Sequence, residues 1–264
     1  MHPIVNIATR AARQAGEIIM RATEHMDKLT ITTKTENDYV SEVDNMAEQE
    51  IIRTIRKAFP DHAILAEESG QTEGDSEFEW IIDPLDGTTN YLHQFPQFSV
   101  SIAVKQKGRL EHAVVYDPQK DEIFSASRGA GAQMNGRRLR VSPAKGLEGA
   151  LLGTGFPFKD QQYLDIYLEM LKQMIIPTAG IRRAGSAALD LAYVAAGRLD
   201  GFWELNLKPW DMAAGLLLIQ EAGGMVSDIK GGHDMLESGH VIAANPRVFK
   251  AMIKTLHPYA KLID

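Results

Sequence analysis

The segment WIIDPLDGTTN (residues 80–90) contains two carboxylates in a setting suited to a metal ion and a phosphate. Asp83 follows an apolar run that predicts a strand, and the proline after it disfavours a helical conformation. Asp86 comes three residues later, and Gly87 permits close backbone approach before Thr88 begins a predicted helix. Free amides at such a helix start favour an anion. Because Mg²⁺ is typically held by carboxylates together with phosphate oxygens, the segment indicates phosphoester hydrolysis.

Other motifs that bind phosphate or metal fit this segment poorly. The haloacid-dehalogenase phosphatases need Asp-x-Asp-Gly-Thr, but position 84 is proline and the second acid of that motif is missing. An EF-hand loop needs oxygen ligands at alternate positions and a Glu at its twelfth residue, and these are absent. The chain also has no Walker phosphate loop. The alternative to a metal site is an ordinary Asp-Gly turn.

The acidic residues of the chain are concentrated around this motif. The 264 residues include 28 Lys and Arg against 35 Asp and Glu, a net charge of −7. Residues 58–104 hold nine acids and no Lys or Arg, so the remainder carries +2. The part from Glu73 to Glu79 is a predicted solvated turn. Glu67, Asp83 and Asp86 are instead embedded in apolar sequence, where cations between the acids would relieve their repulsion.

Several helices and strands are predicted to position these residues. Apolar residues at helical spacing predict helices over residues 3–23, 43–58, 161–174, 186–196, 211–222 and 247–256. Apolar runs between turn residues predict strands over residues 63–66, 80–82, 98–105, 110–116, 122–126, 200–204, 225–228 and 241–244. Helices interleaved with meander and crossover strands predict a layered α/β or α+β architecture. We expect one domain of residues 1–264, with halves of about 1–145 and 146–264.

Composition excludes several other classes of protein. With 44% apolar and 24% charged residues the chain is not disordered, and with no cysteine it has no disulfide, thiolate zinc site or iron–sulfur cluster. No apolar run is long enough to span a bilayer. The start, MHPIVNIATR, lacks the features of a signal peptide, so we expect a cytoplasmic protein. The negative charge and the lack of a Lys/Arg tract argue against direct nucleic-acid binding.

Four separated motifs resemble the inositol monophosphatase family. In chain order they are Glu67-Glu-Ser, the segment 80–90, Gly185-Ser-Ala, and Trp210-Asp-Met-Ala-Ala-Gly with Glu221-Ala-Gly-Gly. The similarity extends from the first helix to Asn245-Pro246, and the tract 185–197 is most similar to the bacterial SuhB type of the family. The resemblance implies a layered αβαβα sandwich of the sugar-phosphatase type. It also implies Mg²⁺-dependent monoester hydrolysis without a phosphoenzyme, lithium sensitivity and commonly a homodimer.

The resemblance also assigns roles to individual residues. Metal ligands would be Glu67, Asp83, the carbonyl of Leu85, Asp86 and Asp211. The attacking water would be oriented by the Thr88 hydroxyl, itself bonded to Asp44. The substrate site would comprise Leu85, Asp86, Gly87, Thr88, Gly185, Ser186, Ala187, Glu204 and Asp211. The backbone amides of Gly87 and Thr88 would hold the phosphate.

Simpler interpretations of some of these residues remain open at this point. Asp44 could be a first-turn acid stabilised by its helix dipole, Asp211 could be a helix-capping acid, and Glu204 could be a plain strand-edge residue. Arg182, in the pair Arg182-Arg183, could steer the phosphate towards the site. The same pair could also lie at a subunit interface or be solvated.

Two functions from different classes are therefore predicted. The first is a Mg²⁺-dependent phosphatase for inositol monophosphate or a similar small polyol phosphate. Relatives with the same metal core hydrolyse fructose 1,6-bisphosphate or nucleotide 3′-phosphates, and the core acids do not separate these substrates. The alternative is a regulatory binding protein whose partners are proteins of the transcription machinery, because the SuhB type is associated with ribosomal RNA antitermination.

Overall fold

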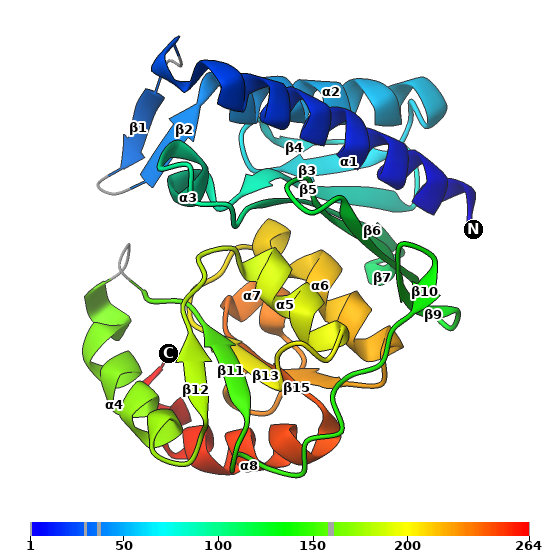
Figure 1. Cartoon of the computed structure of the whole chain (residues 1–264). Helices are drawn as coiled ribbons and strands as arrows, with labels where there is room; N and C mark the ends of the chain where they lie inside the picture. The colour runs from blue at the N-terminus through cyan, green and yellow to red at the C-terminus, as the bar shows by residue number, and fades with distance from the viewer. Residues whose placement is uncertain (1, 29–30, 36–37, 158–160, 264) are drawn as a thin grey trace.

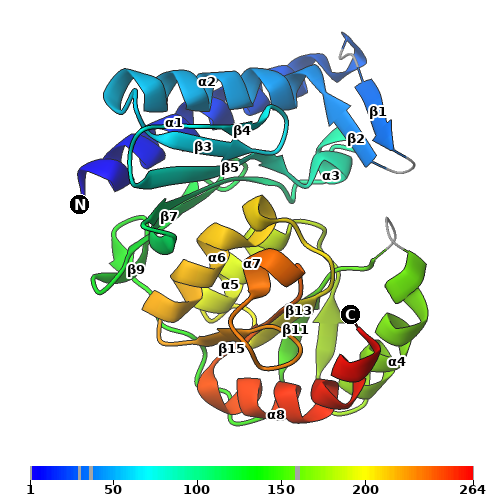
Figure 2. The ribbon, with the colours of Figure 1, turned by 180° about the vertical axis from the view of Figure 1, so that it is seen from behind.

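Two β-sheets alternate with three layers of helices (Figures 1 and 2). The structure is a computed structural model that describes residues 2–28, 31–35, 38–157 and 161–263. For residues 26–28, 31–35, 38–41 and 161 only the backbone is described. The predicted layered αβαβα architecture is confirmed.

The helical layers are built from six main helices and several short ones. The main helices are α1 (Pro3–Ala22), α2 (Glu42–Ala58), α4 (Leu164–Ile175), α5 (Ala187–Ala195), α6 (Pro209–Glu221) and α8 (Pro246–Leu256). The short ones are α3 (Thr88–Leu92), α7 (Met235–Ser238) and the 3₁₀ turns Thr23–Lys28, Gln161–Tyr163 and His257–Leu262. None of the helices in the described ranges has the length and apolarity needed to cross a membrane.

The larger sheet lies in the first half of the chain. It contains β3 (Ala63–Ala66), β4 (Gly70–Thr72), β5 (Phe78–Asp86), β6 (Ser99–Gln106), β7 (Arg109–Asp117), β8 (Glu122–Ser127), β9 (Gly131–Met134) and β10 (Arg137–Arg138). Its strand order is β10-β9-β8-β7-β6-β5-β3-β4, and only β3 and β5 run parallel. The chain also forms a separate hairpin of β1 (Ile31–Thr35) and β2 (Asp38–Ser41).

The smaller sheet lies in the second half. It contains β11 (Leu151–Thr154), β12 (Gly180–Arg182), β13 (Gly201–Glu204), β14 (Met225–Ser227) and β15 (Val241–Ala244). Its order is β12-β11-β13-β15-β14, with β11 parallel to β12 and β13 and the other pairs antiparallel.

Three hydrophobic clusters hold the layers together. The first joins α1 and α2 to one face of the larger sheet, and it buries the alanine-rich stripe of α1. The second joins the other face of that sheet to α5, α6 and the smaller sheet. The third joins the smaller sheet to α4 and α8. Helices α5 and α6 therefore lie between two sheets, which explains why apolar residues occur on nearly all of their sides.

The observed strands differ from the predicted ones in two respects. Strand β5 does not end near Asp83 but continues through Pro84 to Asp86, with a shift of register against β6. A proline has no N–H for the ladder, so a bulge there is the expected accommodation. The strands that were not predicted have two to five residues and are β1, β2, β4, β9, β10, β11 and β12. Their sequences have little alternation between apolar and polar residues.

Helices α5 and α6 approach closely at Gly215. A Cβ atom added to Gly215 would lie 2.4 Å from the Cβ of Leu191 on α5. The Cβ of Leu191 is fixed to its backbone and cannot rotate away. The glycine therefore sets the distance between the two helices in the central layer.

We predict that Gly215→Ala lowers the free energy of unfolding by about 1–3 kcal/mol, the usual effect of overpacking. This loss should exceed the gain of about 0.5–1 kcal/mol that alanine normally brings to a helix interior. Urea unfolding followed by circular dichroism measures the change. Gly146→Ala is the matched control, because a Cβ there meets no atom within 4 Å. A Gly215→Ala protein as stable as wild type would contradict the prediction.

Candidate active site

Three carboxylates from the two halves of the chain meet at one point. Asp83 and Asp86 lie in the last four residues of strand β5, and Asp211 lies in the first turn of helix α6. Each offers an oxygen atom, and these atoms lie within 4.8 Å of one another. Asp83 is 1% exposed and Asp86 is 9% exposed. The sequence-predicted acids Asp83, Asp86 and Asp211 are thus brought together.

The bulge in β5 explains how Asp83 and Asp86 come to share this cluster. Residues three apart in a regular strand point to opposite faces of the sheet. Here Asp83 pairs with Ser101 and Asp86 with Ser99, so one residue of β5 is extra between them. The irregular stretch also lets the Leu85 amide donate a hydrogen bond of 3.0 Å to Asp83 Oδ1.

Burial raises the pKa of two of these carboxyl groups, Asp83 and Asp86. Burial raises the pKa of Asp83 well above its usual value, and the nearby charges of Glu67, Asp86 and Asp211 raise it further. Burial also raises the pKa of Asp86, to about 6. Hydrogen bonds to Asp86 Oδ2 from the Ser186 hydroxyl (2.5 Å) and the Ala188 amide (2.8 Å) oppose that rise.

The donor set fits a hard divalent cation. The clustered ligands among the described residues are all carboxylate oxygens, with no histidine or cysteine. Mg²⁺ and Ca²⁺ prefer oxygen ligands, whereas Zn²⁺ sites usually include nitrogen or sulfur. A cation between the three carboxylates would replace their repulsion by attraction.

Glu67 is held beside Asp83 by contacts of its backbone. Its amide donates to the Ile82 carbonyl at 3.1 Å, which fixes the residue after β3 against β5. The next two amides, of Glu68 and Ser69, donate to the carboxylate of Glu48 at 2.8 and 2.9 Å. Glu48 is buried and lies one turn after Asp44 on α2. Glu48 was not among the predicted site residues, although its i+4 spacing from Asp44 places both on one helix face.

Thr88 and Asp44 form a second polar pair next to the carboxylate cluster. The Thr88 hydroxyl lies 3.0 Å from Asp44 Oδ1 and 3.1 Å from the Leu85 carbonyl oxygen, both of which are acceptors. Asp44 is fully buried on α2. The structure therefore brings this predicted pair together, and the Asp44 side chain does more than stabilise the first turn of its helix.

Gly87 occupies a place where a side chain would not fit. Its φ is +96°, which favours glycine, and a Cβ there would lie 2.9 Å from the Gln97 carbonyl oxygen. Nearby, the Asn90 side-chain amide donates to the carbonyl groups of Gln97 (2.7 Å) and Ala184 (2.8 Å). These bonds tie α3 to the loop that precedes α5.

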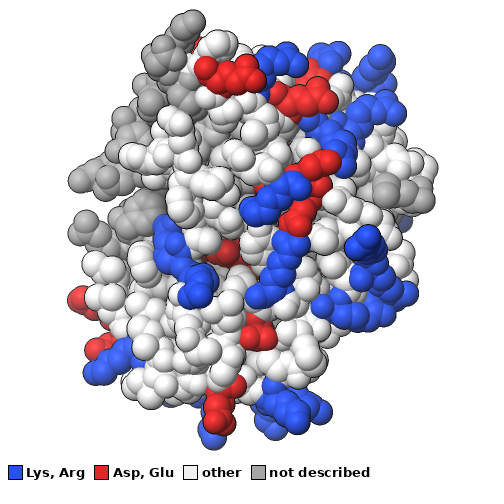
Figure 3. Space-filling model, viewed as in Figure 1, with Lys and Arg blue, Asp and Glu red and all other residues white. Residues whose placement is uncertain are grey.

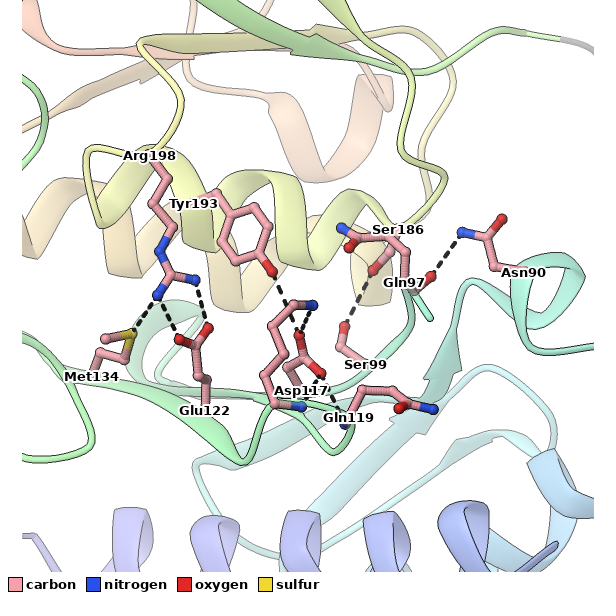
Figure 4. A network of polar contacts seen from close by, with 11 residues as sticks. Asn90, Gln97, Ser99, Asp117, Gln119, Glu122, Met134, Ser186, Tyr193 and Arg198 are labelled. Atoms are coloured by element: carbon pink, nitrogen blue, oxygen red, sulfur yellow. Dashed lines mark hydrogen bonds and ion pairs between the residues drawn. The ribbon is translucent and has the colours of Figure 1, made fainter. Parts of the chain in front are cut away.

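Helix α5 is attached to the larger sheet along its length, as Figure 4 shows. At its beginning the Ser186 and Ser99 hydroxyl groups lie 3.4 Å apart. At its end Arg198 donates two hydrogen bonds of 2.5 Å to the Glu122 carboxylate. The two halves of the site are therefore fixed relative to each other by polar contacts as well as by the core.

A cleft of about 1080 Å³ surrounds the carboxylate cluster. The predicted site residues that line it are Glu67, Asp83, Leu85, Asp86, Gly87, Thr88, Gly185, Ser186, Ala187, Glu204 and Asp211. On the face in Figure 3 charged side chains are spread widely, and near the centre a small acidic surface is recessed among uncharged residues. The Asp211 carboxylate also accepts a hydrogen bond of 2.6 Å from the Lys208 amide. Asp211 therefore caps α6 and belongs to the carboxylate cluster at the same time.

The structure does not place Arg182 among the residues of the cleft. Arg182 is exposed on β12, donates to its own neighbour's carbonyl at Ile181, and does not line the cleft. Arg183 lines the cleft instead, with its guanidinium 5.5 Å from the centre of the Phe156 ring. Successive residues of an extended chain point to opposite sides, so the sequence pair could not show which arginine faces the site.

Comparison with known proteins agrees with this fold. The sequence profile described as the inositol monophosphatase family matches residues 1–260, and the chain belongs to that family. It is 60% identical over 264 residues to "Nus factor SuhB" of Pseudomonas aeruginosa, covering 98% of this chain and 97% of that one.

Solved structures show the same similarity. The extragenic suppressor protein suhB from Bartonella henselae is 44% identical, with a TM-score of 0.94 and coverage of 97% and 98%. The inositol monophosphatase from Anabaena (Nostoc) sp. PCC 7120 is 38% identical, with a TM-score of 0.85 and coverage of 97% and 95%. The predicted family is therefore confirmed.

We predict that Mg²⁺ raises the melting temperature more at pH 7.5 than at pH 5. The pKa of Asp86 is raised from 3.8 to about 6, so the metal-free folded state holds its proton more tightly than the unfolded state. Its contribution to stability is therefore lost as the pH rises from about 4 to about 6. Mg²⁺ should bind the ionised form and restore stability above that range.

Scanning calorimetry at each pH, with excess Mg²⁺ and with EDTA, measures the melting temperature of the metal-bound and the metal-free protein. Asp86→Asn is the control, because it removes this titrating carboxyl and should reduce the pH dependence of the metal-free protein. A Mg²⁺-induced shift that is equal at the two pH values, or absent at both, would contradict the assignment.

Proposed function

We propose that this protein is a Mg²⁺-dependent phosphatase for inositol monophosphate or a similar small polyol phosphate, acting as a cytoplasmic homodimer. The observation that most supports the activity is the meeting of Asp83, Asp86 and Asp211 beside the Thr88–Asp44 pair in one cleft. Membership of the inositol monophosphatase family supports the same reaction class.

The residues that would hold Mg²⁺ are Glu67, Asp83, the Leu85 carbonyl, Asp86 and Asp211, all of which line the cleft. When bound, Mg²⁺ neutralises phosphate charge and lowers the pKa of water. In the metal-free protein burial raises the pKa of both Asp83 and Asp86, so proton release should accompany metal uptake.

Thr88 is placed to orient the attacking water. Its single hydroxyl proton is directed to Asp44 Oδ1 or to the Leu85 carbonyl oxygen. The lone pairs of Thr88 Oγ1 can then accept a hydrogen bond from the water. As the water loses its proton to Thr88 Oγ1, the Thr88 proton can move towards Asp44, whose burial keeps it from exchanging with solvent.

The phosphate and the alcohol would bind on opposite sides of the metal centre. The amides of Gly87 and Thr88 are among those that have no partner within their helix, so they are available to phosphate oxygens. Gly185, Ser186 and Ala187 border the alcohol side, where Glu204 supplies a carboxylate acceptor for hydroxyl groups.

The direct test is phosphate release from inositol 1-phosphate with Mg²⁺ and with EDTA. We expect turnover only with Mg²⁺, and a loss of at least a hundredfold in kcat/KM for Asp86→Asn, because that change removes a charged metal ligand. Fructose 1,6-bisphosphate and a nucleotide 3′-phosphate should be poorer substrates. Highly purified wild-type protein without metal-dependent turnover of any of these esters would refute the proposal.

A second function is supported by the comparison with curated proteins. The relative from Pseudomonas aeruginosa is named a Nus factor, and it matches nearly the whole chain. We propose that this chain also binds proteins of the transcription machinery, and that this binding does not depend on catalysis.

The same Asp86→Asn protein separates these two functions. We expect it to lose phosphatase activity yet to recover the same transcription proteins from lysate as the wild type does, since Asp86 is 9% exposed and cannot contribute much to a protein surface. Wild-type protein that recovers no transcription factor would contradict the second function. Loss of both properties in a folded variant would contradict their independence.

A further inference from the structure

Asp190 is a buried carboxylate that the proposed reaction does not use. It lies on α5, is 2% exposed and lines the cleft beyond the three metal-binding acids. Among the residues that the structure describes, no hydrogen bond or ion pair involves its carboxylate oxygens. A buried carboxylate without a partner is costly to stability, so its presence in a binding cleft points to a ligand.

A glycine beside β11 makes room for Glu204, the carboxylate next to Asp190 in the cleft. Gly153 in β11 and Gly155 just after it lie two residues apart along the chain. A Cβ at Gly153 would lie 2.9 Å from Leu199 and 3.1 Å from Phe202, whereas its distance of 3.6 Å from the Cβ of Asp190 is an ordinary contact. A Cβ at Gly155 would lie 1.8 Å from Glu204 Oε1, so no other residue fits there without moving that carboxylate.

The local charges favour hydrogen bonding by Asp190 and Glu204. Burial raises the pKa of both groups well above the usual values, while the nearby Arg183 lowers them. Neither group belongs to the set of acids that could share a cation among the described residues, which is Asp83, Asp86 and Asp211. A carboxyl group in this setting can accept a hydrogen bond from a hydroxyl or, when protonated, donate one to it.

We propose that Asp190 and Glu204 form a subsite that binds hydroxyl groups on the alcohol part of the substrate and selects polyol phosphates over simple esters. Of these two residues, only Glu204 is among the substrate contacts that the resemblance to the family implies. The new elements are Asp190 as a specificity-determining residue and Gly155 as the positioning residue for Glu204. The inference rests on the proposed phosphatase function.

The experiment compares inositol 1-phosphate with p-nitrophenyl phosphate, an ester whose alcohol part has no hydroxyl groups. The measured quantity is the ratio of the two kcat/KM values. We expect Asp190→Ala to lower this ratio about tenfold, mainly through a higher KM for inositol 1-phosphate, because it removes a hydrogen bond to a charged or polar buried group. Asp190→Asn, which keeps the shape and hydrogen-bonding capacity, should restore the ratio to within about threefold of wild type.

Two further variants separate binding from structural effects. Gly155→Ala should lower the ratio as well, because its Cβ displaces the Glu204 carboxylate. Asp117→Asn is the matched control, since Asp117 is also buried but pairs with Lys120 at 2.6 Å outside the cleft. It should alter stability without altering the ratio.

The outcomes distinguish this proposal from the proposed function. Equal losses on both esters for Asp190→Ala, or an unchanged ratio, would overturn the subsite. If wild-type protein with Mg²⁺ hydrolyses neither ester, the phosphatase proposal fails, and calorimetric binding of inositol 1-phosphate then tests the subsite. Weaker binding by Asp190→Ala than by Asp190→Asn would support it, and equal binding by wild type and Asp190→Ala would overturn it.

Discussion

Mutual repulsion among three carboxylates dominates the centre of this protein. Asp83, Asp86 and Asp211 place oxygen atoms within 4.8 Å of one another, and the first two are nearly shielded from water. Burial penalises each charge, and each charge penalises the others. Hydrogen bonds from Ser186 and Ala188 relieve only part of this strain at Asp86. A divalent cation bound between them would relieve the rest, which is the basis of the proposed metal site.

Such a cluster requires rigid support from both halves of the chain. Strand β5 of the larger sheet supplies two of the acids, and helix α6 supplies the third from the central layer. The periodic helices and apolar strands indicated only a layered α/β or α+β architecture, and the αβαβα order of the layers was expected from the resemblance to the inositol monophosphatase family. The short strands β11 and β12 were not predicted, although β11 lies beside the glycine that shapes the alcohol side of the cleft. That residues 1–264 form one domain stays a prediction.

The sequence revealed those site residues whose neighbours in the chain share their role. Asp83 and Asp86 belong to one short motif, and the acidic charge around them was a reliable guide. Part of that charge has another explanation, since Glu79 pairs with Lys105 on β6 and Glu77 pairs with Lys107 in the turn after β6. Glu48 and Asp190 were missed, because their roles depend on contacts with elements distant in the chain, and the i+4 spacing of Glu48 from Asp44 was the one local signal.

The measurement that tests this account most directly is a crystal structure of the protein soaked with Mn²⁺ and phosphate. Mn²⁺ favours the same oxygen ligands as Mg²⁺ and can be located by its anomalous scattering. We expect metal between Asp83, Asp86 and Asp211, close to Glu67, with phosphate oxygens near the amides of Gly87 and Thr88. Well-ordered crystals in which these carboxylates bind no metal, or in which metal binds only elsewhere, would contradict the account.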